Sequence, residues 1–372
     1  LRYISYMKRI SICTMLAALL LGGCAKTTES GEYDNEVRYL TAWLKIEHPE
    51  LEEAHGIKIN RDPETGLPPK TGRGVYLLSE TEGTGERLAE KGNYVRVSYT
   101  AMSLDGSISS YTEKETAERL GKYEAPNFYG PHLISIAGGA NYAGIIDAVV
   151  GMKVGGERTV LVPKWLMSTQ DNDSEDAYLA SSSSASNTIY NIKLVEIIED
   201  VNKYQIDAIE EYLKKNVVGK LTTDKGPATM PDTTATIGAC KGFYFIPVTD
   251  TTGHRTFPTD TTVKINYTGR RLDGQAFDTT IERTAKDNDI WSSSKTYATQ
   301  SISWGEQFSD LKMSSSSLIS GFSKTLWQMN KGKGIGVFWS DLGYGSSGSG
   351  SMIPGYAPLI FEIEIVSGEE KK

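Results

Sequence analysis

The fold of this chain is decided by residues 266–280, which read NYTGRRLDGQAFDTT. The residues that lead into this stretch, from Val263 to Tyr267, alternate between apolar and polar side chains with a period of two, as a half-buried strand does. Asp273-Gly274 then supplies the residues that a tight connection between strands prefers. Phe277 returns to an apolar side chain after that turn. The sequence therefore predicts a strand, a turn and a returning strand.

The same pattern occurs earlier in the chain at a constant offset. The matching segments are 74–76 with 242–244, 97–100 with 265–268, and 104–106 with 272–274. Three matches at one offset indicate a tandem duplication. A chain of 372 residues is also long enough for two domains of ordinary size.

Each repeat predicts the same set of elements. Apolar side chains recur at helical spacing ahead of each repeat, at Val37, Leu40 and Leu44 and at Ile206, Ile209 and Leu213. Strand patterns follow at 94–99, 158–162 and 189–198, and again at 263–267 and 359–366, with short helical segments at 143–149 and 320–328. An antiparallel sheet with one short helix is an α+β domain. We expect the leading helices to pack on their own domains, and a dimer or partner surface is the alternative.

The first residues have the pattern of an export signal. Lys8-Arg9 follows Met7, and an apolar run over 10–23 ends at Cys24. A basic start, a short apolar run and small residues before a cleavage point are typical of a secretory signal peptide. Residues 21–24, LGGC, resemble the bacterial lipobox, in which the cysteine carries lipid. We expect a protein anchored by Cys24 to the outer membrane and facing the periplasm; a plain signal peptide is the alternative.

These patterns divide the chain as follows. The predicted segments are a signal peptide over 1–23 with Met7 as the true start, a tether over 24–32, a first domain over 33–200, a connecting helix and loop over 201–236, and a second domain over 237–372.

Composition argues against nucleic-acid and metal chemistry. The net charge is −8, and no cluster of basic residues is present to bind phosphates. Cys13 falls in the signal peptide and Cys24 carries the lipid, which leaves Cys240 as a single thiol. The four histidines lack metal-ligand spacing, so we expect no metal and no cofactor.

The second repeat carries a set of motifs that are spread over most of its length. They are YTG at 267–269, LDG at 272–274, FD at 277–278, LISGF at 318–322, GYG at 343–345 and IP at 353–354, followed by Phe361. In this order and spacing the repeat resembles the FKBP-type peptidyl-prolyl cis-trans isomerases. The resemblance implies two FKBP-like domains, each a sheet wrapped around a short helix, and an isomerase that assists the folding of exported proteins.

The resemblance also implies the site. Its catalytic residues would be Tyr267, Phe277, Asp278 and Tyr344, and its contacts to a proline-containing polypeptide would be Arg283, Leu318, Ile319, Phe322, Ile353 and Phe361. Asp278 is expected to interact with Tyr267 and Arg283. Phe322 takes the place of the family's tryptophan, and an insertion after Arg283 leaves the aromatic of the next strand open between Ile302 and Trp304.

The first repeat shares the framework without this chemistry. Ile108-Ser109 stands where the resemblance calls for Phe-Asp, Ile145 stands at the aromatic floor, and only Tyr99 and Tyr190 match pocket aromatics. We therefore expect an inactive first domain that serves as a binding module or spacer. Two non-enzymatic alternatives are a peptide-binding chaperone and a scaffold lipoprotein of an envelope complex. The sequence leaves the oligomeric state open.

Overall fold

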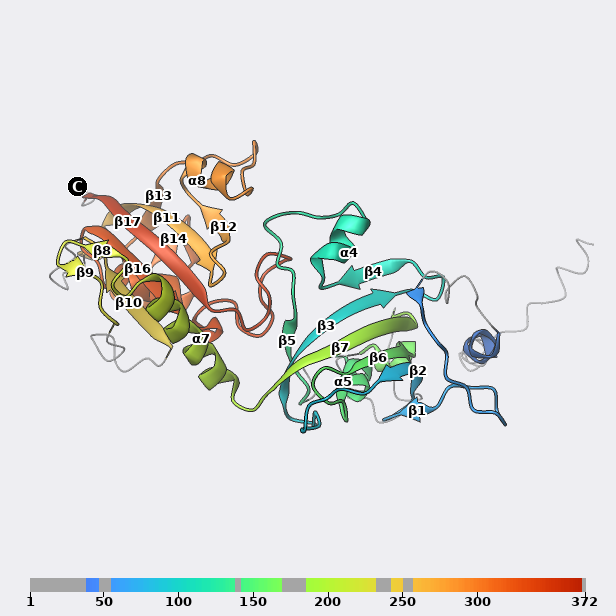
Figure 1. Cartoon of the computed structure of the whole chain (residues 1–372). Coiled ribbons are helices and arrows are strands. Elements are labelled where there is room, and N and C mark those ends of the chain that lie inside the picture. The colour runs from blue at the N-terminus through green and yellow to red at the C-terminus, as the bar shows by residue number, and fades with distance from the viewer. Residues whose placement is uncertain are drawn as a thin grey trace, which may run out of the picture.

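The computed structural model describes residues 38–46, 55–137, 142–168, 185–231, 242–249 and 257–369. Outside these residues lie the predicted signal peptide and tether, which include Cys24, and the single remaining thiol, Cys240. Figure 1 shows two separate sheets, one built from the blue-to-green half of the chain and one from the orange-to-red half, with α7 (Val201–Asn216) between them in the sequence. No helix in the described part of the chain is long and apolar enough to cross a membrane.

The first sheet is antiparallel and has seven strands. Their order is β1-β2-β6-β7-β3-β4, and β5 pairs with the edge of β3 that faces away from β7. The strands are β1 (Lys70–Thr71), β2 (Val75–Thr81), β3 (Tyr94–Met102), β4 (Ile108–Tyr111), β5 (His132–Ser135), β6 (Glu157–Val162) and β7 (Thr188–Ile198).

The second sheet repeats this order with eight strands. It runs β10-β16-β17-β11-β13-β14-β15, and β12 pairs with β11. Its strands are β10 (Phe243–Pro247), β11 (Thr262–Arg271), β12 (Ala276–Thr279), β13 (Gln300–Ser303), β14 (Lys312–Met313), β15 (Ser316–Ser317), β16 (Gly332–Phe338) and β17 (Leu359–Glu369). Each strand of the core β2-β6-β7-β3 therefore has a counterpart in β10-β16-β17-β11, as a duplication predicts.

Each sheet wraps around one short helix, α5 (Ala143–Val149) in the first domain and α9 (Ser320–Trp327) in the second. Each helix lies so close to its sheet that one position of the helix has room only for glycine. A Cβ on Gly144 would lie 2.1 Å from a methyl carbon of Val162, and a Cβ on Gly321 would lie 2.4 Å from the Phe338 ring. Any larger side chain would push the helix off the sheet, which would open the core that the two share. The predicted α+β class is confirmed.

The leading helices cover the other face of each sheet. Residues 38–45 are helical, and Trp43 and Leu44 pack with Tyr76 and Leu78 of β2. In the second domain Ile209 and Leu213 of α7 pack on Tyr244 and Ile246 of β10. The helix α7 begins at a cap, because the Asp200 carboxylate accepts the backbone N–H groups of Asn202 and Lys203 at 2.9 Å. The expectation that the leading helices pack on their own domains is confirmed, and α7, within the predicted connecting helix and loop over 201–236, contributes a layer to the second domain.

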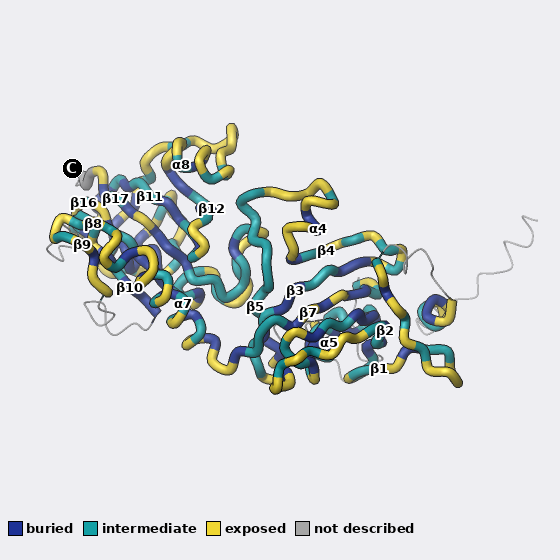
Figure 2. Tube along the Cα trace, viewed as in Figure 1, coloured by how far each residue is buried: buried dark blue, intermediate teal, exposed yellow. Residues whose placement is uncertain are grey.

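A smaller helix follows β4 and β12 at equivalent positions of the two repeats. These helices are α4 (Lys114–Arg119) and α8 (Glu282–Asp287), and both lead through a long loop into β5 and β13. Figure 2 shows α8 and the loop after it as largely exposed. The insertion predicted after Arg283 is thus present in both domains. The remaining elements are the hairpin β8 (Thr222–Thr223) with β9 (Gly226–Pro227) and the short turns η1 (Lys164–Leu166), η2 (Phe308–Asp310) and η3 (Ser340–Leu342).

Candidate active site

Four rings meet inside the second domain, and we call them the aromatic cluster: Tyr267, Phe277, Phe322 and Phe361. Phe361 is central, because its ring centroid lies 5.0 Å from that of Phe322, 5.7 Å from that of Phe277 and 6.2 Å from that of Tyr267. The Tyr267 and Phe322 rings meet edge to face at 5.3 Å. Such perpendicular contacts suit the ring quadrupoles. The structure thus brings together four of the predicted site residues, from β11, β12, α9 and β17.

One glycine makes this cluster possible. Gly269 on β11 lies beside Asp278 and Phe361 on its neighbouring strands, and the register shifts directly after it. A Cβ at this position would lie 2.7 Å from the Phe277 ring and 2.9 Å from the Phe361 ring. The motif Tyr-Thr-Gly therefore reflects a packing requirement at its glycine.

The polar edge of the cluster is a hydrogen-bonded pair. The Tyr267 hydroxyl donates to Asp278 Oδ2 at 2.6 Å, as expected from the sequence. Burial raises the pKa of the Tyr267 phenol, and the Asp278 charge and this hydrogen bond raise it further. Burial and the same carboxylate also raise the pKa of Tyr344. Both phenols therefore stay protonated at neutral pH and can act as hydrogen-bond donors around one carboxylate.

The predicted interaction between Asp278 and Arg283 is wrong. Arg283 points away on α8, where its Nε pairs with Asp287 at 2.8 Å and its side chain is 85% exposed. The spacing of one helical turn favours that local pair. Lys295, in the loop between α8 and β13, instead reaches Asp278 Oδ1. Sequence reasoning missed Lys295 because it lies in the insertion, where no family motif places it.

The remaining predicted contacts are divided between the core and its rim. Ile353 is 4% exposed and packs in the same core as Phe322 and Phe361, whereas Leu318 and Ile319 are partly buried against that core. Tyr344 is 37% exposed. Leu318, Ile319 and Ile353 thus belong to or border the core that contains the aromatic cluster.

Ile302 in β13 and Trp304 just after it, the two candidates for the family's aromatic position in this strand, both lie in the core. Ile302 is fully buried, and Trp304 is 2% exposed, with its ring stacked on Trp327 at 5.4 Å. Neither therefore offers a ring at the rim of the cluster. The half-buried side chain at the start of β13 is Gln300.

The first domain has lost most of this arrangement. The strand pairing places Ser110 opposite Ala101, as Asp278 lies opposite Gly269. The equivalent of Phe277-Asp278 is therefore Ser109-Ser110, and the alignment with Ile108-Ser109 is wrong by one residue. The bulge falls at the same place in both repeats, so the offset of the matching motifs holds through this turn. The Tyr99 hydroxyl lies 3.5 Å from the Ser110 hydroxyl, where the second domain has its short bond to Asp278.

The rings of the first domain show the same loss. Tyr99 and Tyr190 still lie together, with centroids 6.0 Å apart. Ile145 occupies the helix position of Phe322, next to the close approach at Gly144. Ala101 carries the Cβ that the aromatic cluster of the second domain would exclude.

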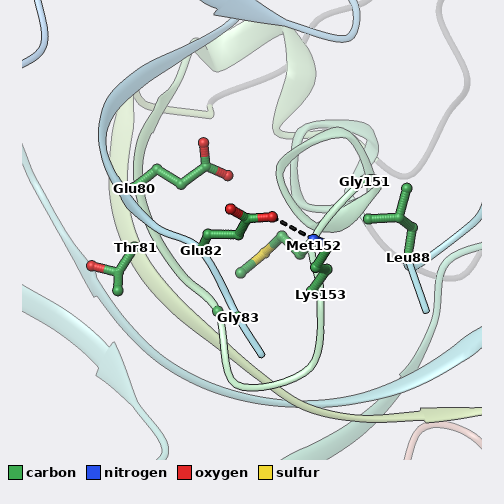
Figure 3. A pocket seen from close by; sticks show the side chains of 9 residues that line it. Glu80, Thr81, Glu82, Gly83, Leu88, Gly151, Met152 and Lys153 are labelled. Atoms are coloured by element: carbon green, nitrogen blue, oxygen red, sulfur yellow. Dashed lines mark hydrogen bonds and ion pairs between the residues drawn. The ribbon is translucent and has the colours of Figure 1, made fainter. Parts of the chain in front are cut away.

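The glycine-rich turn of the first domain, residues 150–157, has a structural role. A hollow of about 180 Å³ lies beside it, lined by Glu80, Thr81, Glu82, Gly83, Leu88, Gly151, Met152, Lys153 and Gly156. Figure 3 shows Glu82 and Lys153 paired across it. Gly83 lies so close to Val154 that a Cβ would be 2.4 Å from its carbonyl oxygen, and Gly155 has a positive φ of 84°. The turn thus needs glycine for its backbone geometry. Among the described residues, no group of His, Cys, Asp and Glu side chains is placed to hold a metal.

Comparison with known proteins places these features in a family. A profile described as FKBP-type peptidyl-prolyl cis-trans isomerase matches residues 253–366. FK506-binding protein 1A of Aspergillus fumigatus is 32% identical over 111 residues, which are 30% of this chain and 80% of that protein. The macrophage infectivity potentiator of Trypanosoma cruzi is 28% identical over 166 residues, 43% of this chain and 67% of that protein. The three FKBP domains of wheat FKBP73 align with 80% of this chain and 95% of theirs, at 14% identity and a TM-score of 0.28.

Proposed function

Since the chain belongs to the FKBP-type family of peptidyl-prolyl cis-trans isomerases, we propose that its second domain catalyses this reaction on the aromatic cluster and acts on exported proteins. The observation that carries the proposal is the bond from Tyr267 to Asp278 at 2.6 Å, made at the edge of four packed rings. The substrates are proline-containing polypeptides.

The reaction asks little of acid-base chemistry. Rotation about a peptide bond has a barrier of about 18–20 kcal/mol, and the bond before proline exchanges over tens to hundreds of seconds. No covalent bond is made or broken, so the enzyme must bind the twisted amide better than either planar form. A twisted amide loses its conjugation, and its carbonyl is then better suited to apolar surroundings. The aromatic cluster supplies such surroundings and an apolar surface for the proline ring.

The polar pair orients groups and does not transfer a proton. Asp278 accepts the Tyr267 hydrogen bond and fixes that phenol, while Lys295 compensates the carboxylate charge. The raised pKa of Tyr344 keeps its phenol as a donor for the peptide, whereas the single proton of the Tyr267 phenol is held by Asp278. Because Lys295 reaches Asp278 from the α8–β13 loop, that loop is part of the site, and Arg283 is outside it.

The first domain is proposed to be inactive. Ser109 and Ser110 replace the phenyl ring and the carboxylate, and Ile145 replaces a second aromatic ring. An apolar surface of two rings without an oriented carboxylate lacks the features on which the proposal for the second domain depends.

A peptide assay of the full mature chain tests the proposal. The protein should accelerate cis/trans exchange of a test peptide that has one X-Pro bond. Asp278→Ala should lower kcat/KM on the order of ten-fold, which corresponds to roughly 1.4 kcal/mol in the activation free energy. Ser110→Ala is the matched control, because it alters the equivalent position of the first domain. An exchange rate equal to that of the peptide alone would overturn the enzymatic function.

The main alternative is a chaperone that binds extended peptides without catalysis. The chaperone and the isomerase can be distinguished by two assays on the same protein sample. Suppression of client aggregation without faster proline isomerisation supports the chaperone. If both activities are present, Asp278→Ala separates them, since a binding role of the first domain should survive that substitution.

Export and membrane anchoring complete the proposal. The run 10–23 followed by Cys24 supports a signal peptide and a lipid anchor, which would hold the protein on the periplasmic face of the outer membrane. Cys24→Ser should release the protein from the membrane fraction or leave its precursor unprocessed. Unchanged attachment of this variant would rule out lipidation at Cys24.

A further inference from the structure

Each domain contacts the other through a loop. In the first domain this is residues 124–130, between α4 and β5, which we call the arm; in the second it is residues 343–358, between η3 and β17, which we call the flap. The backbone N–H of Phe128 donates to the carbonyl oxygen of Ser351 at 2.9 Å, and the Ser351 hydroxyl donates to Asn127 Oδ1 at 2.6 Å. In Figure 1 the red flap lies beside the coil that leads from the arm into β5.

A buried arginine strengthens this contact. Arg271, at the end of β11, is only 6% exposed. Its Nη1 donates to the carbonyl oxygen of Pro126 in the arm at 2.9 Å and to that of Met352 in the flap at 2.6 Å. Its guanidinium carbon also lies 5.5 Å from the centroid of the Phe128 ring. A buried charge is stable only when its donors are satisfied, so arm and flap are held through one shared cation.

A second contact lies at the base of the flap. The Tyr94 ring of β3 meets the Tyr356 ring edge to face at 5.5 Å. Tyr356 has a positive φ of 59°, a conformation that a bulky side chain rarely adopts. Its N–H donates to the Gly345 carbonyl oxygen at 2.9 Å, which closes the flap on itself. Strained backbone of this kind persists where its surroundings fix it, and Tyr94 is part of those surroundings.

The flap also carries residues of the candidate site. Tyr344 precedes Gly345, and Ile353 follows Met352 and packs in the core with Phe322 and Phe361. We infer that the arm of the first domain is a positioning element for the flap, and that it thereby sets the catalytic efficiency of the second domain. The inference rests on the proposed isomerase function. It gives the first domain a role in the reaction without a site of its own.

The duplication offers an internal comparison for this role. Asn127 in the arm and Lys295 in the second domain occupy equivalent positions of the same duplicated loop, since they are separated by the same offset as the matching motifs of the two repeats. The copy in the second domain reaches inward to Asp278, whereas the copy in the first domain reaches outward to Ser351. One loop thus contributes to a single site from both domains.

The test compares two aromatic-to-alanine variants of the full mature chain. Phe128→Ala removes the ring under Arg271, and Tyr123→Ala is the control, because its exposed ring stacks on Tyr129 within the first domain. Hydrogen exchange of the flap amides 346–356 should be at least several-fold faster in Phe128→Ala and unchanged in Tyr123→Ala. kcat/KM should fall about five-fold in the first variant only, an effect near 1 kcal/mol.

A second variant covers the case in which Phe128→Ala unfolds the first domain. Arg271→Lys keeps the charge but loses the planar guanidinium, whose Nη1 donates to both carbonyl oxygens while its Nε and Nη2 hold the Asp273 carboxylate. It should loosen the same flap amides, and combining it with Phe128→Ala should add little. Flap exchange unchanged in both variants would overturn the positioning role even if the wild type is an active isomerase. If the wild type is inactive but the flap amides exchange faster in the variants, the proposed isomerase function is overturned, whereas the structural role of the arm in holding the flap is supported.

Discussion

The Tyr267 phenol and the Asp278 carboxylate are held together by a bond that needs the phenol proton. Burial and the neighbouring charge raise the pKa of Tyr267 above its unfolded value of 10.0. A group whose pKa rises on folding stabilises the fold fully below its unfolded pKa and loses that contribution as pH rises through the folded pKa. The contribution of this phenol should therefore fade above about pH 10.

Tyr267→Phe tests this dependence. Urea unfolding of wild type and variant, at about pH 8 and about pH 11, should show a larger loss of stability with pH in the wild type. The comparison cancels the other buried tyrosines, which both proteins share. A stability difference between the two proteins that stays constant with pH would contradict the shifted pKa of Tyr267.

Substitutions of Lys295 and Arg283 are predicted to differ in effect, although both cations follow Asp278 in the sequence. Lys295→Ala should lower kcat/KM about two- to five-fold, because a partly exposed ion pair is worth up to about 1 kcal/mol. Arg283→Ala should change it little, since that side chain is 85% exposed and pairs with Asp287. Steady-state isomerase kinetics decide between them, and a larger loss with Arg283→Ala would restore the role implied by the resemblance.

At this scale the sequence predicted which candidate residues on strands and on α9 lie together, because motif spacing fixes their places in the fold. It could not place Lys295, since a loop side chain has no periodicity. A signal was nevertheless present in the repeat itself. Tyr129 and Tyr297 are equivalent positions of the two repeats, and each hydroxyl accepts a backbone N–H, from Glu124 and from Ser292. The insertion is therefore a duplicated, ordered loop.

Among the elements, α7 has the clearest energetic role. Its buried residues Ile209 and Leu213 cover Tyr244 and Ile246 on the outer face of the second sheet. Leu213→Ala should lower the free energy of unfolding of the second domain by about 2–5 kcal/mol, through lost burial and a cavity. Glu211→Ala, on the exposed side of the same helix, should stay within about 0.5 kcal/mol. Urea denaturation of the full chain measures both, and similar losses would mean that the helix does not pack as described.

The sequence predicted the long elements well because each has a clear period. The strand pattern at 263–267 lies within β11, and the helical segment at 143–149 is α5. The two-residue strands of β8 and β9, or of β14 and β15, are too short for any period and were not predicted. Strand order also does not follow from alternation. It follows from which faces must be buried together, around α5 and α9 on one side and under the leading helices on the other.

For the whole molecule, the repeat combines two similar scaffolds with one candidate site. The first domain keeps the strand order, the central helix and the glycine-rich turn, all of which its fold requires. It has lost the groups that the fold does not require, namely the ring and the carboxylate now replaced by Ser109 and Ser110. Its arm has instead become part of the surroundings of the flap. Packing needs have thus preserved one set of residues in each copy, and chemistry has preserved another set in only one copy.

This division predicts that catalysis cannot be returned to the first domain by one residue. In an Asp278→Ala background, Ser110→Asp should leave isomerase activity at the level of Asp278→Ala alone. The new carboxylate would face Tyr99, but Ser109 and Ile145 would still replace two rings, and the Cβ of Ala101 would occupy the space that Gly269 leaves open. Asn127 would also still face Ser351, where the second domain has a lysine on its carboxylate. Recovery of activity in the double variant would show that a carboxylate opposite a tyrosine is sufficient, and that the aromatic cluster is packing alone.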